Sequence, residues 1–146
     1  MRAFDLILVA AVSAAFSFST VASDAGALVD KGEAQLKAGE IDAAVATLQE
    51  AVAKDPESSL AYTRLGGAHV MKQDYGTALE SFKQAIVLDA RNANAFVGMA
   101  VAYIHSGRYP LARAALEEAK RIDPSKQEEV DKLIAWIDRR ASGGSH

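Results

Sequence analysis

The chain has 146 residues, of which 50% are hydrophobic, and a formal net charge of −3. Its length suits one domain, and its many alanines favour closely packed helices. The weak negative charge and the lack of a Lys/Arg cluster argue against a nucleic-acid surface. The absence of cysteine excludes disulfides, thiolate metal sites and thiol nucleophiles.

The first 23 residues differ in character from the rest of the chain. Arg2 precedes an apolar run from Leu6 to Phe18, and small residues follow before charge resumes at Asp24. This order is typical of a secretory signal peptide, so we expect export, most simply to a bacterial periplasm. Cuts after Ala22, Ser23 or Ala25 fit the small residues at that point. The alternatives are a membrane anchor over residues 6–22, short for the about 20 residues that a bilayer span needs, and a cytosolic chain.

From residue 25 onward the sequence repeats with a period of 34 residues. Small residues recur three times at this spacing, and large apolar residues recur between them. Such a period indicates a stack of similar supersecondary units. The aligned sets include Gly32, Gly66 and Ala100; Ala44, Ala78 and Ala112; Leu48, Phe82 and Leu116; Ala51, Ala85 and Ala119; and Asp55, Asp89 and Asp123.

The period divides the chain into units at 25–58, 59–92 and 93–126, each with two helical patterns of about 14 residues. In the first unit the break between helices falls at residues 38–40, around Gly39. In the third unit it falls at residues 106–109, and Pro110 suits the first turn of the next helix. The third unit ends at Asp123-Pro124, because a residue before proline avoids the helical region.

After Pro124 one further helix is predicted, over residues 125–140. Val130, Leu133, Ile134 and Ile137 form an apolar stripe, while charged residues lie mostly off it. We expect residues 127–140 to cap the last helix pair, with Trp136 packing at the edge of the stripe. Residues 141–146 are expected to form a flexible tail.

The second unit carries an ordered set of residues that resembles the tetratricopeptide repeat (TPR) family. The set is Tyr62, Leu65-Gly66, His69, Ala78, Phe82 and Ala85, and the other two units vary the same pattern. The resemblance covers nearly the whole chain after residue 24. It implies an all-α fold, a right-handed superhelix of antiparallel helix pairs, closed here by the capping helix.

In this family the first helix of each pair lines a concave groove that binds another polypeptide. Carried over by position, the resemblance gives an apolar groove with a few charged residues. Such a groove would accept an amphipathic helix or another apolar segment of a protein partner. The groove residues implied are Val29, Glu33, Leu36, Arg64, Val70, Met71, Val97, Val101, Ile104 and His105, with Gly67 and Gly98 leaving room for the partner.

One family subclass grips the C-terminal carboxylate of chaperones with a Lys/Asn/Asn/Lys/Arg clamp. None of the matching positions keeps the family residue, so we do not expect that mode of binding. Those positions are Val29, Glu33, Arg64, Asn94 and Gly98. The alternatives to partner recognition are a self-associating scaffold that uses the same groove as a homo-oligomer, and a surface that is simply packed. The groove could also be partly filled by residues 125–140.

Few residues suggest catalysis. His69 and His105 lie outside any metal-binding or nucleophile motif, and His69 occupies a packing position of the repeat. The adjacent pairs Glu117-Glu118 and Glu128-Glu129 point to different sides of a helix, which is typical of solvated surface. We therefore expect no enzyme, no cofactor, no metal and no nucleic-acid partner, and membrane contact only if the N-terminal segment is retained.

Overall fold

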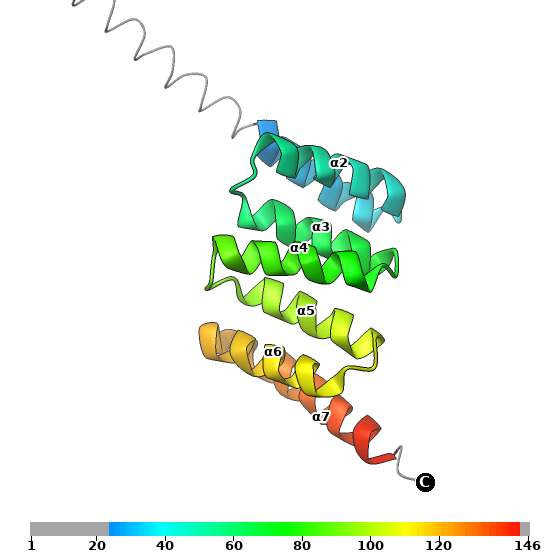
Figure 1. Ribbon diagram of the computed structural model, residues 1–146, viewed down its shortest axis with the longest axis vertical. Coiled ribbons are helices and arrows are strands. Elements are labelled where there is room, and N and C mark those ends of the chain that lie inside the picture. The colour runs from blue at the N-terminus through cyan, green and yellow to red at the C-terminus, as the bar shows by residue number, and fades with distance from the viewer. Residues whose placement is uncertain (1–23, 144–146) are drawn as a thin grey trace, which may run out of the picture.

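The computed structural model describes residues 24–143, and every regular element in that range is helical. Residues 24–37 form the first helix. The helices that follow stack one after another along the long axis of the molecule, from α2 to α7 (Figure 1). They are α2 (Ile41–Lys54), α3 (Ser59–Met71), α4 (Tyr75–Leu88), α5 (Ala93–His105), α6 (Tyr109–Ile122), the short 3-10 turn η1 (Pro124–Lys126) and α7 (Gln127–Gly143).

Each 34-residue unit therefore holds one helix pair, and the all-α repeat architecture expected from the sequence is confirmed. The signal peptide or anchor predicted over residues 1–23 lies outside the described residues, as does the second half of the predicted C-terminal tail, residues 144–146. None of the helices between residues 24 and 143 has the length and apolar character needed to span a bilayer.

Side chains cap the starts of three helices, whereas α2 and α6 begin without a side-chain cap. Ser58, Asp74 and Asn92 each accept a hydrogen bond from the backbone N–H three residues later, which caps α3, α4 and α5. The side-chain amide of Asn92 also donates to Ser59 Oγ and Thr63 Oγ1, at 2.8 Å each. This side chain therefore ties the second unit to the third.

The repeated small and large residues form the core. Ala44, Ala78 and Ala112 are fully buried where paired helices cross, and Leu48, Phe82 and Leu116 fill the space beside them. The close approach depends on glycine: a Cβ at Gly66 would lie 2.7 Å from the Phe82 ring. The core thus consists of buried clusters that follow one another from unit to unit.

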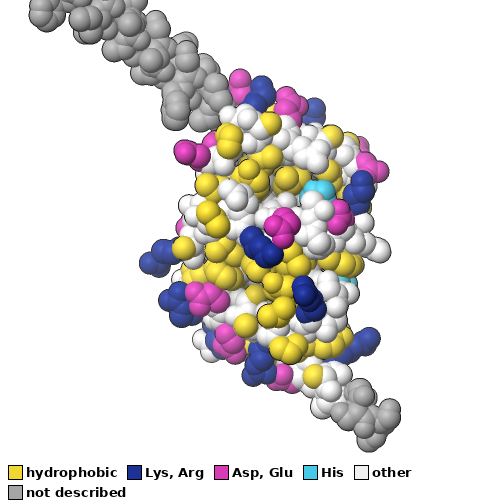
Figure 2. Space-filling model, in the orientation of Figure 1, with side chains coloured by type: hydrophobic (Ala, Val, Ile, Leu, Met, Phe, Trp, Pro, Cys, Tyr) yellow, Lys and Arg dark blue, Asp and Glu magenta, His cyan; other side chains and the backbone are white. Residues whose placement is uncertain are grey.

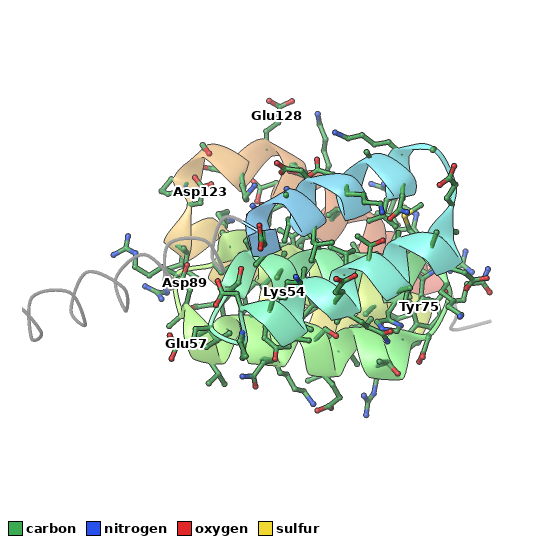
Figure 3. All side chains as sticks on the ribbon, turned by 90° about the horizontal axis from the view of Figure 1, so that it is seen from above. Lys54, Glu57, Tyr75, Asp89, Asp123 and Glu128 are labelled. Atoms are coloured by element: carbon green, nitrogen blue, oxygen red, sulfur yellow. The ribbon has the colours of Figure 1, made fainter. Side chains whose placement is uncertain are left out.

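The connections between helices lie at the two opposite ends of the helices, on either side of the stack. The links that follow α2, α4 and α6 lie together at one end, where Glu57, Asp89 and Asp123 are labelled (Figure 3). Tyr75, at the turn between α3 and α4, is labelled at the opposite end (Figure 3). We call these the link end and the turn end.

Helix α7 covers the third unit as the sequence predicted, although it begins at Gln127 and continues to Gly143. Val130, Ile134 and Ile137 are buried in one cluster with Ala112 and Leu116 of α6. Two ion pairs across the same helices, Lys120–Asp131 at 2.9 Å and Arg113–Asp138, fix the orientation of α7. The capping helix is therefore a packed part of the stack.

Candidate interaction groove

Three of the four predicted groove residues of the third unit, all except Val97, line a pocket of about 600 Å³ at the turn end. Val101, Ile104 and His105 of α5 line one side of this pocket. Gly107 and Tyr109 of the following turn and the start of α6 lie next to them. Leu133, Trp136 and Arg140 of α7 complete the lining. We call this the α5–α7 pocket.

Trp136 is the largest apolar side chain at the α5–α7 pocket and is 38% exposed. Its ring meets Tyr109 edge to face, with ring centroids 6.3 Å apart. The Arg140 guanidinium carbon lies 5.7 Å from the centre of the same ring. Aromatic contacts of this kind hold the indole in place while part of its surface stays open.

The sequence did not assign the three α7 residues to the groove. It predicted Trp136 at the edge of the apolar stripe, which the structure places between Tyr109 and Arg140. A lone large aromatic residue off the buried face of a helix was the available signal, because such residues gather at interaction sites.

His105 lies at the mouth of the α5–α7 pocket and links it to the second unit. Its imidazole stacks on the Tyr75 ring of α4, with centroids 5.2 Å apart and planes 2° from parallel. The side chain stays exposed. The stack fixes one rim of the pocket without filling it.

The two residues of the predicted groove that carry full charges, Glu33 and Arg64, lie in the first two units. Glu33 accepts a hydrogen bond from Arg64 Nε at 3.0 Å and pairs with Lys37 at 3.0 Å. The Lys37 hydrogen bond, followed by the charge of Arg64, holds the pKa of the Glu33 carboxyl below its ordinary value. These two predicted groove residues therefore bind each other, whereas the pocket of the third unit has a mostly apolar lining.

The groove assignment of Val29 is wrong. This side chain is only 4% exposed and packs against Ala51 of α2 and Ala61 of α3. Leu36 and Val70 are less buried than Val29, and each packs against a core cluster with part of its side chain exposed. Met71 is 46% exposed, and Val97 is half-buried.

The expectation that Gly98 leaves room for a partner is also wrong. A Cβ at this position would lie 2.4 Å from the Phe82 ring of α4, so the space beside Gly98 belongs to the core. A Cβ at Gly67 would meet nothing within 4 Å. Of these two glycines, only Gly67 therefore borders open space.

His69 is buried, as its packing position in the repeat predicted, and is 6% exposed. Its Nδ1 has no hydrogen-bond partner among the described residues and lies 3.8 Å from Asp74 Oδ2. Burial lowers the pKa of the imidazole, and the Asp74 carboxylate opposes that shift. Within residues 24–143 no cluster of three or more His, Cys, Asp or Glu side chains could hold a metal.

Comparison with known proteins agrees with a helical-repeat protein that presents a groove. Two sequence models described as tetratricopeptide repeat match the chain, one over residues 29–93 and the other over residues 69–137. The chain belongs to the tetratricopeptide repeat family.

Among its relatives, anaphase-promoting complex subunit 3 of Schizosaccharomyces pombe is 30% identical over 82 residues. That match takes in 56% of this chain and only 12% of the length of the relative.

Two solved structures show the same fold in complexes. The TPR2B domain of yeast Sti1 in its pHsp70 complex has a TM-score of 0.78 and 21% identity, covering 81% of this chain and 98% of that one. The Yersinia enterocolitica type III secretion chaperone SycD, in complex with a peptide of the translocator YopD, has a TM-score of 0.72 and 19% identity. It covers 80% of this chain and 93% of that one.

Proposed function

We propose that this chain is a protein-interaction module that binds an apolar segment of another polypeptide on its groove face. The α5–α7 pocket carries the proposal, because three predicted groove residues and three capping-helix residues converge on it. Its volume falls within the about 300–1,000 Å³ of ordinary ligand sites. The similar folds of Sti1 and SycD, each in a complex with a polypeptide, support the same function.

The face drawn in Figure 2, on which α2 and α6 lie in front of the first helix and α7, also carries apolar surface. On the face drawn in Figure 2, hydrophobic surface extends over the middle of the stack, interrupted by a few charged side chains. Apolar surface of this kind on a monomer usually marks an interaction site.

The cellular role that we propose is an exported adaptor in the assembly of an envelope complex. The support is the N-terminal sequence, with Arg2, the apolar run from Leu6 to Phe18 and the small residues after it. An exported chain would meet partners of the envelope, and an apolar groove suits an amphipathic helix of such a partner.

A matched pair of valine substitutions tests the binding face. Val101→Glu places a charge in the α5–α7 pocket, whereas Val87→Glu places it on α4, where the side chain is already 77% exposed. Peptides are selected against the full chain from a random display library, and their affinities for both variants are measured by calorimetry. We expect Val101→Glu to weaken binding by about 30-fold or more, because substitutions at interface centres cost about 2 kcal/mol.

Val87→Glu should bind as the wild type does, and both variants should keep its circular dichroism spectrum. If Val101→Glu unfolds, Val97→Glu replaces it, since Val97 lies one turn earlier on the same helix. Undiminished binding by the groove variant would show that the partner uses another face. Light scattering of the free chain addresses the alternative: oligomers that Val101→Glu dissociates would favour a self-associating scaffold.

A further inference from the structure

The α5–α7 pocket has a one-sided charge. None of its eight lining residues is acidic, and the basic side chains of Arg140 and His105 are among them. Arg64, Arg113 and Arg121 each form an ion pair. Arg140 forms no ion pair with any residue between 24 and 143. It lines the α5–α7 pocket beside Trp136 and Leu133.

The setting of Arg140 leaves its hydrogen-bond donors available. Its side chain is exposed, and its guanidinium carbon lies 5.7 Å from the centre of the Trp136 ring, within the range of a cation–π contact. The N–H donors lie in the guanidinium plane and match the two oxygens of a carboxylate. The pocket thus combines an apolar floor with a cation held at its rim.

A second pocket at the link end shows that this charge pattern is not general. It has a volume of about 440 Å³, and its lining includes both signs, with Asp89 and Asp123 beside Arg91 and Lys126. Such a lining offers no preference for an acidic ligand. Of these two pockets, the α5–α7 pocket is therefore the one expected to prefer negative charge.

We propose that the α5–α7 pocket recognises a helical polypeptide segment with one large apolar side chain and one carboxylate a helical turn away. The apolar side chain would pack against Trp136 and Leu133, and the carboxylate would pair with Arg140. Trp136 and Arg140 are themselves one turn apart on α7, so a partner helix with its two groups at i and i+4 matches their spacing of about 5–6 Å. This inference rests on the proposed binding function and names the chemistry of its partner.

Trp136 supplies a direct measurement, because it is the one tryptophan in the chain. An apolar side chain packed on the exposed part of the indole should shift its emission to shorter wavelength and protect it from acrylamide quenching. The probe is the peptide most enriched from a library of helical peptides selected on the full chain, with a twin in which its acidic residue is changed to Gln.

The matched variants are Arg140→Gln and Arg139→Gln, which remove the same charge from neighbouring exposed positions of α7. Only Arg140 lines the pocket. We expect Arg140→Gln to weaken the acidic peptide about twofold to fivefold at low salt, as for a solvent-accessible ion pair. The same variant should bind the Gln twin as the wild type does, Arg139→Gln should change neither affinity, and added salt should remove the difference.

The outcomes separate this inference from the function it rests on. If the selected peptides bind in the groove, as shown by loss of binding in Val101→Glu, but lack acidic residues or ignore Arg140→Gln, the acidic preference is wrong and the binding function stands. If no peptide alters the Trp136 emission or depends on Val101, both are wrong. A dimer of the chain that the peptide cannot displace would place a second copy in the pocket and would also overturn the inference.

Discussion

At the scale of single residues, the turns between paired helices contain one strained position. Gly39, Gln73 and Gly107 occupy the same place in the 34-residue period, and all three have a positive φ, of 78°, 64° and 70° respectively. Glycine adopts this conformation freely, but a residue with a side chain is disfavoured there by roughly 1–2 kcal/mol. Gln73 therefore carries strain that the other two units avoid.

We predict that Gln73→Gly stabilises the protein by about 1 kcal/mol in urea unfolding, less a few tenths for the added freedom of the unfolded chain. The matched control is Gln84→Gly, an exposed position inside α4, which should destabilise by about 1 kcal/mol. Equal losses at the two positions would mean that the turn tolerates glutamine without strain.

Residue-scale predictions from the sequence succeeded where the period repeated a residue type. Gly39 and Gly107 marked their turns, whereas Gln73 gave no such signal, because glutamine is ordinary in helices and rare at positive φ. Val29 was misassigned for a different reason. Its position in the repeat suggested the groove, but the depth of a side chain depends on neighbours 22 and 32 residues away, Ala51 and Ala61.

At the scale of elements, the fit of α5 against α4 depends on one aromatic ring. Phe82 is 2% exposed and lies where a Cβ at Gly66 or Gly98 would come within 3.0 Å of it. The ring is enclosed by backbone from both adjacent helices, so it has little space in which to move. Any added methyl at these glycines must displace the ring or the helix that carries it.

A pair of identical substitutions separates this packing from helix propensity. Gly67→Ala should stabilise by about 0.5–1 kcal/mol, because the new methyl meets nothing within 4 Å and alanine favours helix. Gly98→Ala gains the same propensity but forces its methyl into Phe82, so it should be less stable than Gly67→Ala by about 1–3 kcal/mol. Thermal melts followed by circular dichroism measure both, and equal melting temperatures would show that Phe82 moves at no cost.

The helices themselves were the most predictable part of the fold. Small residues at fixed spacing are required wherever two helices cross closely, so the period located every pair. The end of α7 was less predictable, since the helix continues past residue 140 to Gly143. Apolar periodicity locates the buried face of a helix, while its last turn depends on local capping.

At the scale of the whole molecule, the stack creates sites that no single unit contains. The α5–α7 pocket draws its lining from the third unit and the capping helix, and His105 joins it to Tyr75 of the second unit. The polar pocket at the link end likewise takes residues from α3, the α4–α5 link and the end of α6. The family resemblance implied the groove face, but the convergence of side chains from separate units required the packed structure.

The whole molecule also constrains where an exported form would begin. Ala25 is 2% exposed and lies in the helix over residues 24–37, so a cut after Ala25 would remove a core residue and the first residues of that helix. A cut after Ala22 or Ser23 would keep all of the helix that the structure describes, residues 24–37. We therefore predict that the protein purified from its native host begins at Ser23 or Asp24, which an intact-mass measurement decides. Val9→Arg should prevent processing, because a charge interrupts the apolar run that export requires. A wild-type mass that retains residues 1–22 would contradict cleavage and favour a membrane anchor.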